Sequence, residues 1–328
     1  MEPIKDRYER IVDYLRISVT DRCTLRCIYC MPPEGVTAID HRSVLSFEEI
    51  LRIARISAGL GVRKIRLTGG EPLVRKDLPR LIEGLSRIEG IEDISLTTNG
   101  QWLKHQAREL ADAGLKRVNV SLDSLNAERY SRITRGGSMA EVLQGIEKAE
   151  GVGLAPIKIN MIPIRGVNDD EVEAFARLTW NTPYQVRFIE LMPTRTGSAW
   201  SREKWVSTDE IKERVSTLGR LVPVKMRKSG PARYFRFENQ PGVIGFITPV
   251  THHFCESCNR IRLTSDGKLR PCLFSEAEID LKSLMRSGGS DSEIERLLRL
   301  AVEIKPERHR LDSKDHLSLL ASMSRIGG

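Results

Sequence analysis

Strand-like and helix-like segments alternate over the first two-thirds of the chain, and this alternation limits the possible folds more than any other feature. Short apolar segments of strand type are expected at residues 14–19, 64–68, 93–98, 117–122, 157–162 and 186–191. Amphipathic patterns predict helices at residues 46–59, 77–88, 101–113, from 127, 139–150 and 169–180. Six such βα repeats predict parallel strands joined by right-handed helical crossovers. Two closures fit them: an open doubly wound sheet, and a barrel or partial barrel.

The alternation fades after residue 193. The later patterns predict a helix at residues 207–218, two short antiparallel strands at 234–237 and 243–247, a helix near 291–302, and a basic, loop-like stretch from residue 305. We therefore expect two parts: an α/β barrel-like part in residues 1–230 and an α+β extension in residues 231–328.

Polar and glycine-rich segments follow the expected strands. They are the cysteine-containing run 21–32, Gly69-Gly70-Glu71-Pro72, Thr97-Thr98-Asn99-Gly100, Ser121-Leu122-Asp123-Ser124 and Met192-Pro193. In a barrel, the carboxyl ends of all the strands face one mouth, so these segments would surround a common cavity.

Three cysteines, Cys23, Cys27 and Cys30, form the first cysteine trio. A loop this short can wrap three sulfurs around one compact centre, and three thiolates suit a cubic iron–sulfur cluster with one iron left open for a small molecule. Two alternatives stay open. A disulfide framework needs an even grouping and an oxidising compartment. Structural zinc usually takes four protein ligands, and the nearest histidine is His41.

A second group, Cys255, Cys258 and Cys272, forms the second cysteine trio. Asp266-Gly267 between its members is a strong hairpin signal. Folding about that turn pairs Ser265 with Lys268, sets Cys272 opposite Ile261, and so brings Cys272 near Cys258. The trio again suits a cluster with an open iron. A zinc site completed by His252 or His253 is the alternative.

The bulk composition favours a soluble protein with an anionic partner. The 328 residues carry a formal net charge of +8, which suits nucleic acid or a phosphorylated small molecule. Aromatic residues make up only 5% and do not interleave with basic runs, so nucleic acid is the weaker partner. Arg260 and Arg262, two apart on an expected strand, point the same way and suit a triphosphate or an exposed ion-paired face. No N-terminal apolar segment of signal or membrane-spanning type is apparent, which favours the cytoplasm.

These motifs resemble a known family. Cys23-x-x-x-Cys27-x-Tyr29-Cys30 is similar to the signature of the radical S-adenosylmethionine (SAM) enzymes, and Gly69-Gly70-Glu71-Pro72 resembles their methionine-binding turn. The runs 245–247, 254–264 and 266–273 and the terminal Gly327-Gly328 resemble the GTP 3′,8-cyclases of molybdenum cofactor biosynthesis. The similarity extends from residue 15 to 328. One departure is Thr24, where the family often has asparagine.

The resemblance implies a partial (β/α)6 barrel of the TIM type, with a C-terminal α+β extension that carries a second cluster. The implied metal ligands are Cys23, Cys27, Cys30, Cys255, Cys258 and Cys272, which would hold two [4Fe–4S] clusters. The implied SAM contacts are Tyr29, Gly70, Ser121 and Met192. The implied GTP contacts are Arg16, Arg66, Thr97, Lys158, Arg260 and Arg262, and the implied catalytic residues are Arg260, Arg262, Gly327 and Gly328.

The activity that the resemblance implies is conversion of GTP to (8S)-3′,8-cyclo-7,8-dihydroguanosine 5′-triphosphate. A 5′-deoxyadenosyl radical from SAM would take hydrogen from C3′ of the ribose, and C3′ would then bond to C8 of guanine. Implied partners are an electron donor, a downstream enzyme that forms cyclic pyranopterin monophosphate, and a second copy of the chain. The glycine tail would enter the substrate cavity, although a frayed terminus or a modified carboxylate also fits. Two rival classes are a peptide-modifying radical SAM enzyme and a zinc-bearing nucleic-acid binder.

Overall fold

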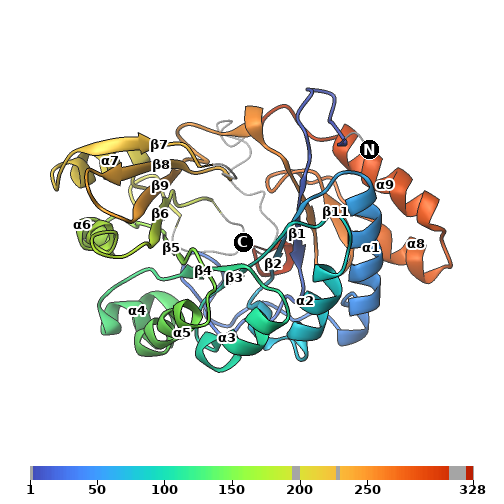
Figure 1. Ribbon diagram of the computed structural model, residues 1–328, viewed down its shortest axis with the longest axis horizontal. Coiled ribbons are helices and arrows are strands. Elements are labelled where there is room, and N and C mark those ends of the chain that lie inside the picture. The colour runs from blue at the N-terminus through green and yellow to red at the C-terminus, as the bar shows by residue number, and fades with distance from the viewer. Residues whose placement is uncertain (1–2, 194–199, 227–229, 310–322, 328) are drawn as a thin grey trace.

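Six parallel strands follow one another in chain order across the middle of one curved sheet (Figure 1). The computed structural model describes residues 3–193, 200–226, 230–309 and 323–327. The six strands are β1 (Tyr14–Ser18), β2 (Lys64–Thr68), β3 (Asp93–Thr98), β4 (Arg117–Ser121), β5 (Lys158–Met161) and β6 (Gln185–Ile189). Because their order never reverses, right-handed crossovers place every connecting helix on the same face. The sheet is therefore of barrel type, and the doubly wound alternative is wrong.

Helices cover the outer face of this sheet, as Figure 1 shows. They are α1 (Phe47–Gly59), α2 (Leu78–Ser86), α3 (Leu103–Asp112), α4 (Ala127–Thr134), α5 (Met139–Gly151), α6 (Val172–Arg177) and α7 (Thr208–Ser216). The core lies between the layers, where strand residues such as Ile17 and Leu67 and helix residues such as Ile53 and Leu81 are fully buried. Ser46 caps α1 in a capping box. None of the described helices is both long and apolar enough to cross a membrane.

Strands that follow β6 in the chain extend the sheet at both edges. They are β7 (Leu221–Val224), β8 (Arg233–Phe237), β9 (Val243–Ile247), β10 (Arg260–Leu263), β11 (Lys268–Arg270) and β12 (Ile279–Asp280). The antiparallel pairing of β8 with β9 is as predicted, but β9 also runs parallel to β6, and β10 runs parallel to β1. The described strands form one sheet of twelve, with β12 and β7 at its two edges. The sheet is therefore a partial barrel, widened beyond its six βα units.

The β10–β11 hairpin forms where Asp266-Gly267 predicted it, but its register differs by one residue. Arg262 pairs with Arg270, and the Thr264 amide donates to the Lys268 carbonyl, so the predicted pairing of Ser265 with Lys268 is wrong. The loop has three residues and ends at Gly267, whose φ of +82° allows the left-handed conformation that such loops require. Continued beyond β11, the observed register places Cys272 opposite Arg260 and not opposite Ile261.

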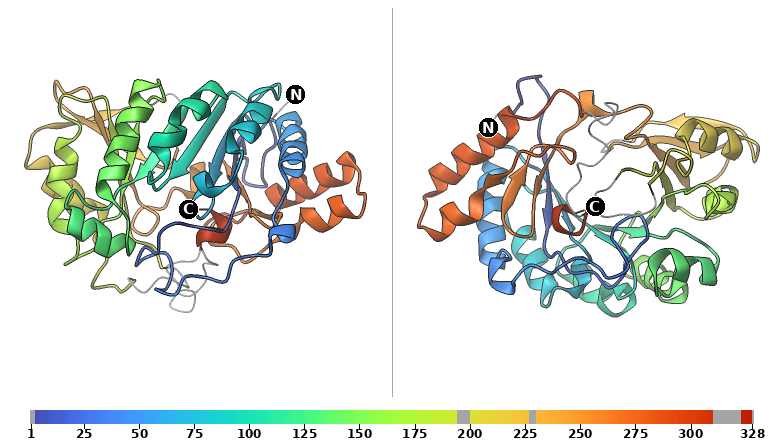
Figure 2. Two further views of the ribbon diagram at one scale, coloured as in Figure 1. Left: turned by 90° about the horizontal axis from the view of Figure 1, so that it is seen from below. Right: turned by 180° about the vertical axis from the view of Figure 1, so that it is seen from behind.

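Three helices complete the described chain: α8 (Leu281–Arg286), α9 (Asp291–Glu303) and α10 (Met323–Ile326). The stretch from residue 305 was expected to be loop-like, and α10 departs from that expectation. Both Figure 1 and Figure 2 show α10 on the concave side of the sheet, close to β1, whereas α8 and α9 lie outside one edge. The chain thus carries its last residues to the inside of the partial barrel. Residues 310–322 and Gly328 lie outside the described residues.

Candidate active site

The first cysteine trio lies in a cavity at the carboxyl ends of the strands, on the loop that follows β1. The lining of this cavity includes all three cysteines and all four expected SAM contacts, namely Cys23, Cys27, Cys30, Tyr29, Gly70, Ser121 and Met192. The three thiols are free. Burial raises the pKa of each thiol, that of Cys30 to about 12. Thiols held in this way become thiolates readily only when a metal centre supplies positive charge.

The glycine turn after β2 packs against the backbone of the cysteine loop. A Cβ on Gly70 would lie 2.3 Å from the Arg22 carbonyl oxygen, and the Gly70 amide donates to the Thr20 carbonyl at 2.8 Å. The family resemblance implies that Gly70 contacts SAM. The structure adds a close approach to protein backbone, which also requires glycine there.

Glu71, which the sequence reasoning left without a role, ties the glycine turn to the end of β3. Its buried carboxylate accepts hydrogen bonds from the Leu73 amide at 3.0 Å, the Thr98 hydroxyl at 2.7 Å and the Asn99 amide at 2.6 Å. Burial raises the pKa of Glu71 to about 7, against the effect of these hydrogen bonds. The turn is therefore fixed relative to β3 at the floor of the first cavity.

Asp123 is a second residue for which no role was predicted. The Tyr29 hydroxyl donates to its Oδ2 at 2.6 Å, and the Ile162 amide donates to its Oδ1 at 3.0 Å. Burial raises the pKa of Asp123 to about 6. This carboxylate therefore orients the one aromatic side chain within the first cysteine motif.

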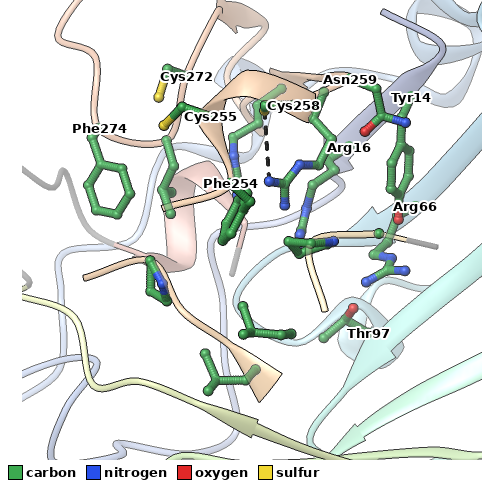
Figure 3. A pocket seen from close by; sticks show the side chains of 18 of the residues that line it. Tyr14, Arg16, Arg66, Thr97, Phe254, Cys255, Cys258, Asn259, Cys272 and Phe274 are labelled. Atoms are coloured by element: carbon green, nitrogen blue, oxygen red, sulfur yellow. Dashed lines mark hydrogen bonds between the residues drawn. The ribbon is translucent and has the colours of Figure 1, made fainter. Parts of the chain in front are cut away.

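The second cysteine trio lines another cavity, shown in Figure 3. Cys255 begins a short 3₁₀ turn (Cys255–Ser257), and Cys272 follows β11. Burial acts to raise the pKa of the Cys258 thiol, but the charges of Arg260 and Lys305 outweigh it and lower that pKa to about 6. His252, one of the two histidines named for the zinc alternative, contacts the Asp209 carboxylate at 2.9 Å.

Both trios offer the donors that an iron–sulfur cluster takes, because such clusters are held by cysteine thiolates. All six cysteines are free thiols, so the disulfide alternative is wrong for this structure. Within the described part of the chain, no three His, Cys, Asp or Glu side chains are arranged to hold a single metal ion. A cluster differs from a single ion in having its own metal–sulfur core between the protein sulfurs. Each set of three thiols therefore fits the expected iron–sulfur cluster.

A row of arginines crosses the floor of the second cavity. Arg16 on β1 lies directly opposite Arg262 on β10 and Arg66 on β2, so the three side chains emerge on the same face. All three line the cavity. Burial, and then the charges of Arg262 and Arg66, lower the pKa of Arg16 well below its usual range, and burial lowers that of Arg262 to about 9. A polyanion placed here would relieve this repulsion.

Lys158 and Arg187 add further basic side chains from β5 and β6. Burial, and then the neighbouring arginines, lower the pKa of Lys158 to about 6. Arg187 was not predicted, although it alternates with apolar neighbours as Lys158 and Arg66 do. Its guanidinium donates to Asn160 at 2.8 Å and to Asn119 at 2.7 Å, and these amides hold it toward the cavity. The expected GTP contacts Thr97 and Arg260 also line this cavity, so all six lie together.

The two cavities adjoin. Their linings share Thr97, Asn160, Ile189, Met192 and Met323. Gly327 lies at this junction, because its carbonyl accepts a hydrogen bond from Arg262 and a Cβ on it would lie 1.9 Å from the Thr68 hydroxyl. Gly328, the other glycine expected to act in catalysis, lies outside the described residues.

Comparisons with known proteins agree with this arrangement. The model of the radical SAM superfamily matches residues 17–179, and the molybdenum cofactor synthesis C model matches residues 184–311. A GTP 3′,8-cyclase of Thermodesulfovibrio yellowstonii is 52% identical over 99% of this chain and 100% of its own length. Another, of Pelotomaculum thermopropionicum, is 50% identical over 99% and 100%.

Among solved structures, Streptococcus suis SuiB bound to S-adenosylmethionine has a TM-score of 0.59 at 14% identity, covering 98% of this chain and 77% of that one. SuiB bound to the precursor peptide SuiA has a TM-score of 0.60 at 17% identity, covering 89% and 68%. At these identities the likeness concerns the fold alone. The full-length relatives decide the family: the chain belongs to the GTP 3′,8-cyclase family within the radical SAM superfamily.

Proposed function

We propose that this enzyme converts GTP to (8S)-3′,8-cyclo-7,8-dihydroguanosine 5′-triphosphate, the first step of molybdenum cofactor biosynthesis. The observation that carries the proposal is the junction of the two cavities. One holds the first cysteine trio, the other holds the second trio and the arginine row, and five residues line both. A hydrogen atom can pass between two molecules only when their reacting atoms come within contact distance, and a shared chamber provides that proximity.

The first cavity suits SAM beside a cluster on Cys23, Cys27 and Cys30. When bound and reduced, that pair supplies a 5′-deoxyadenosyl radical, which takes hydrogen from a neighbouring carbon. Tyr29, Gly70, Ser121 and Met192 are proposed as the SAM contacts, and each lines this cavity. The chain's own part is to orient SAM and to exclude water. The Tyr29–Asp123 hydrogen bond and the hydrogen bonds to Glu71 help to orient SAM, because they fix the positions of the loops around the cavity.

The second cavity suits GTP. We propose that Arg16, Arg66 and Lys158 bind the triphosphate, with Arg187 added to the predicted set. Arginine recognises phosphate oxygens through paired N–H donors. A bound anion stabilises the charged form of a buried lysine that lies among arginines. Arg260 and Arg262 lie closer to the second trio, and Thr97 lies at the junction with the first cavity. With these residues in these positions, the triphosphate of GTP would lie along the floor of the second cavity, and the ribose would lie toward the first cavity.

The second cluster, on Cys255, Cys258 and Cys272, belongs to this proposal. Its open iron would meet the guanine base of GTP. Support comes from the three free thiols, which line the same cavity as the arginine row. The proposed catalytic residues are Arg260, Arg262, Gly327 and Gly328. The contact of Arg262 with the Gly327 carbonyl supports a joint role for these two residues.

Several finer expectations remain predictions. They are an electron donor, a downstream enzyme that forms cyclic pyranopterin monophosphate, a homodimer, the absence of nucleic-acid and membrane partners, a cytoplasmic location, and a functional division at residue 230. The division is compatible with a continuous sheet, since the chain after residue 230 carries the second trio and contributes strands β8 to β12, which lie on both sides of the six central strands.

An anaerobic assay tests the proposal. The reconstituted protein, a reductant, SAM and GTP should yield 5′-deoxyadenosine and an isomer of GTP, both seen by mass spectrometry. Cys27→Ala should abolish both products. Cys258→Ala should lose the GTP isomer while some SAM cleavage continues, and normal product from this variant would disprove the role of the second trio. A peptide-modifying enzyme would ignore GTP, and a zinc-bearing nucleic-acid binder would contain zinc without acid-labile sulfide.

A further inference from the structure

Lys305 occupies an unusual position for a lysine. It follows α9, and only 2% of its surface is exposed. Its ammonium group lies 3.4 Å from the Cys258 sulfur, 2.8 Å from the Arg260 carbonyl and 2.9 Å from the Pro271 carbonyl. Three contacts match the three donors of an ammonium group. Because Pro271 directly precedes Cys272, this one side chain joins the two separate chain segments that carry the second cysteine trio.

The charge of Lys305 has a sulfur as its nearest anionic partner. Among the described residues, its ammonium group contacts the Cys258 sulfur and two backbone carbonyls, and none of these contacts is to a carboxylate. A buried ammonium group is costly unless a negative charge compensates it, and two carbonyls supply only dipoles. A cluster held by three thiolates carries net negative charge, so it suits this site electrostatically.

The residues that follow Lys305 continue around the second cysteine trio. The backbone amide of His309 hydrogen-bonds to the Cys255 thiol. The Pro306 and Glu307 carbonyls accept hydrogen bonds from Arg10, which also donates to the Cys255 carbonyl at 2.7 Å. Arg10 is itself paired with buried Asp6 at 2.6 Å. Residues 305–309 therefore form a brace over the trio, in which Lys305 contributes the charged contact to sulfur.

The first cysteine trio has a different environment. The side-chain contact to Cys23 comes from the neutral amide of Asn99, at 3.9 Å, and the nearby buried carboxylates are those of Glu71 and Asp123. The positive charge of Arg26 also acts on Cys23, but more weakly than the negative charge of Glu71. Reduction adds an electron to a cluster, so a nearby positive charge and hydrogen bonds to sulfur raise its reduction potential. The two trios would therefore hold clusters of unlike potential.

We propose that Lys305 is a positioning residue for the second cluster. It holds Cys258 and Cys272 in the arrangement that binds the cluster, and its charge raises the cluster's reduction potential. This inference rests on the second cluster of the proposed function.

The test uses the full-length chain with Cys23, Cys27 and Cys30 changed to alanine, so that only the second cluster forms. After anaerobic reconstitution this background should hold about four iron atoms per chain. Lys305→Met should bind less iron, and the clusters that form should show a midpoint potential, measured by EPR-monitored titration, shifted to more negative values. Lys282→Met is the matched control, because Lys282 also gives its ammonium group to a carbonyl, that of Ser43. It should change neither quantity.

Two further measurements separate the possible failures. A background chain that binds no cluster would disprove the second cluster itself, and this inference with it. If Lys305→Met leaves the iron content and the midpoint potential unchanged, the role of Lys305 is disproved and the second cluster is not.

In a chain with the first trio intact, Lys305→Met should keep the first cluster and its SAM cleavage, which shows that the barrel is folded. Lys305→Arg retains the charge, so a potential equal to that of Lys305→Met would contradict the electrostatic effect.

Discussion

The hydroxyl of Tyr29 donates a 2.6 Å hydrogen bond to the carboxylate of Asp123, which lies 94 residues later in the chain. The other carboxylate oxygen of Asp123 accepts from the Ile162 amide. Asp123 is almost fully buried, with 2% of its surface exposed. The loop after β4 therefore sets the position of an aromatic ring that belongs to the first cysteine motif.

Removing this hydrogen bond should weaken SAM binding. Asp123→Ala and Tyr29→Phe should each reduce SAM affinity or cleavage roughly 10- to 100-fold, since a hydrogen bond to a charged group contributes about 1.5–3 kcal/mol. If the two residues act together, the double variant should be little worse than either single variant. The measurement is 5′-deoxyadenosine formation at varied SAM concentrations. Effects that simply multiply would mean that Asp123 acts independently of Tyr29.

Glu71 should make the stability of the metal-free protein depend on pH. Its pKa is raised to about 7 by burial, so the folded state holds the proton more tightly than the unfolded state does. The stability from this group is therefore present at low pH and is lost as the pH rises from about 4.5 to about 7. The loss amounts to about 3 kcal/mol at 1.36 kcal/mol per pH unit.

Urea unfolding at several pH values measures this effect. Glu71→Gln should gain stability relative to the parent protein as the pH rises through that window. Glu128→Gln, at an exposed position on α4, should follow the parent curve. Parallel curves for the parent and Glu71→Gln would contradict the raised pKa.

GTP binding should take up a proton through Lys158. Burial and the neighbouring arginines lower the pKa of this lysine to about 6, so it is mostly neutral at pH 8 in the free protein. A bound triphosphate favours the charged form and raises that pKa again. Isothermal titration calorimetry in buffers of different ionisation enthalpy should find uptake approaching one proton per GTP at pH 8. Lys158→Met should abolish the uptake, and Lys148→Met, at an exposed position on α5, should not.

Gly327 should not tolerate a side chain. Its φ is +76°, and a Cβ would lie 1.9 Å from the Thr68 hydroxyl. Gly327→Ala should therefore move the chain end away from Arg262 and reduce formation of the GTP isomer at least tenfold, with a loss of about 1–2 kcal/mol from the backbone conformation alone. Gly288→Ala is the control, because that residue has φ +87° with no atom within 4 Å of the added Cβ. Equal activity losses in the two variants would assign the effect to backbone strain and not to the contact with Thr68.

The local features of this protein were readable from its sequence, and the long-range ones were not. The strand and helix periods located β1 to β6 to within about two residues, because side-chain alternation depends on neighbours in the chain. The pairing of β10 with β1 brings together residues 246 positions apart, such as Tyr14 and Arg260, and no local pattern encodes it. The one-residue register error at β10–β11 arose because Asp-Gly signals a turn without fixing its length.

The same distinction applies to the site. The cysteine spacings located the two trios, whereas Arg16 and Arg66 of the arginine row were expected from the family resemblance. Within the sequence itself, the signal for such a residue is a charged side chain that alternates with apolar neighbours on an expected strand, as Arg66 does. Arg187 carried the same signal on β6 and was missed. Asp123 and Lys305 carried no usable signal, because each acts through a contact with a segment far away, 94 and 47 residues distant.

Deuterium transfer tests the central claim that the two cavities share one reaction. With GTP deuterated at C3′, unlabelled SAM and the reconstituted enzyme, the 5′-deoxyadenosine produced should gain one mass unit as the GTP isomer accumulates. Cyclised product accompanied by 5′-deoxyadenosine that carries no deuterium would contradict direct hydrogen transfer between the two cavities.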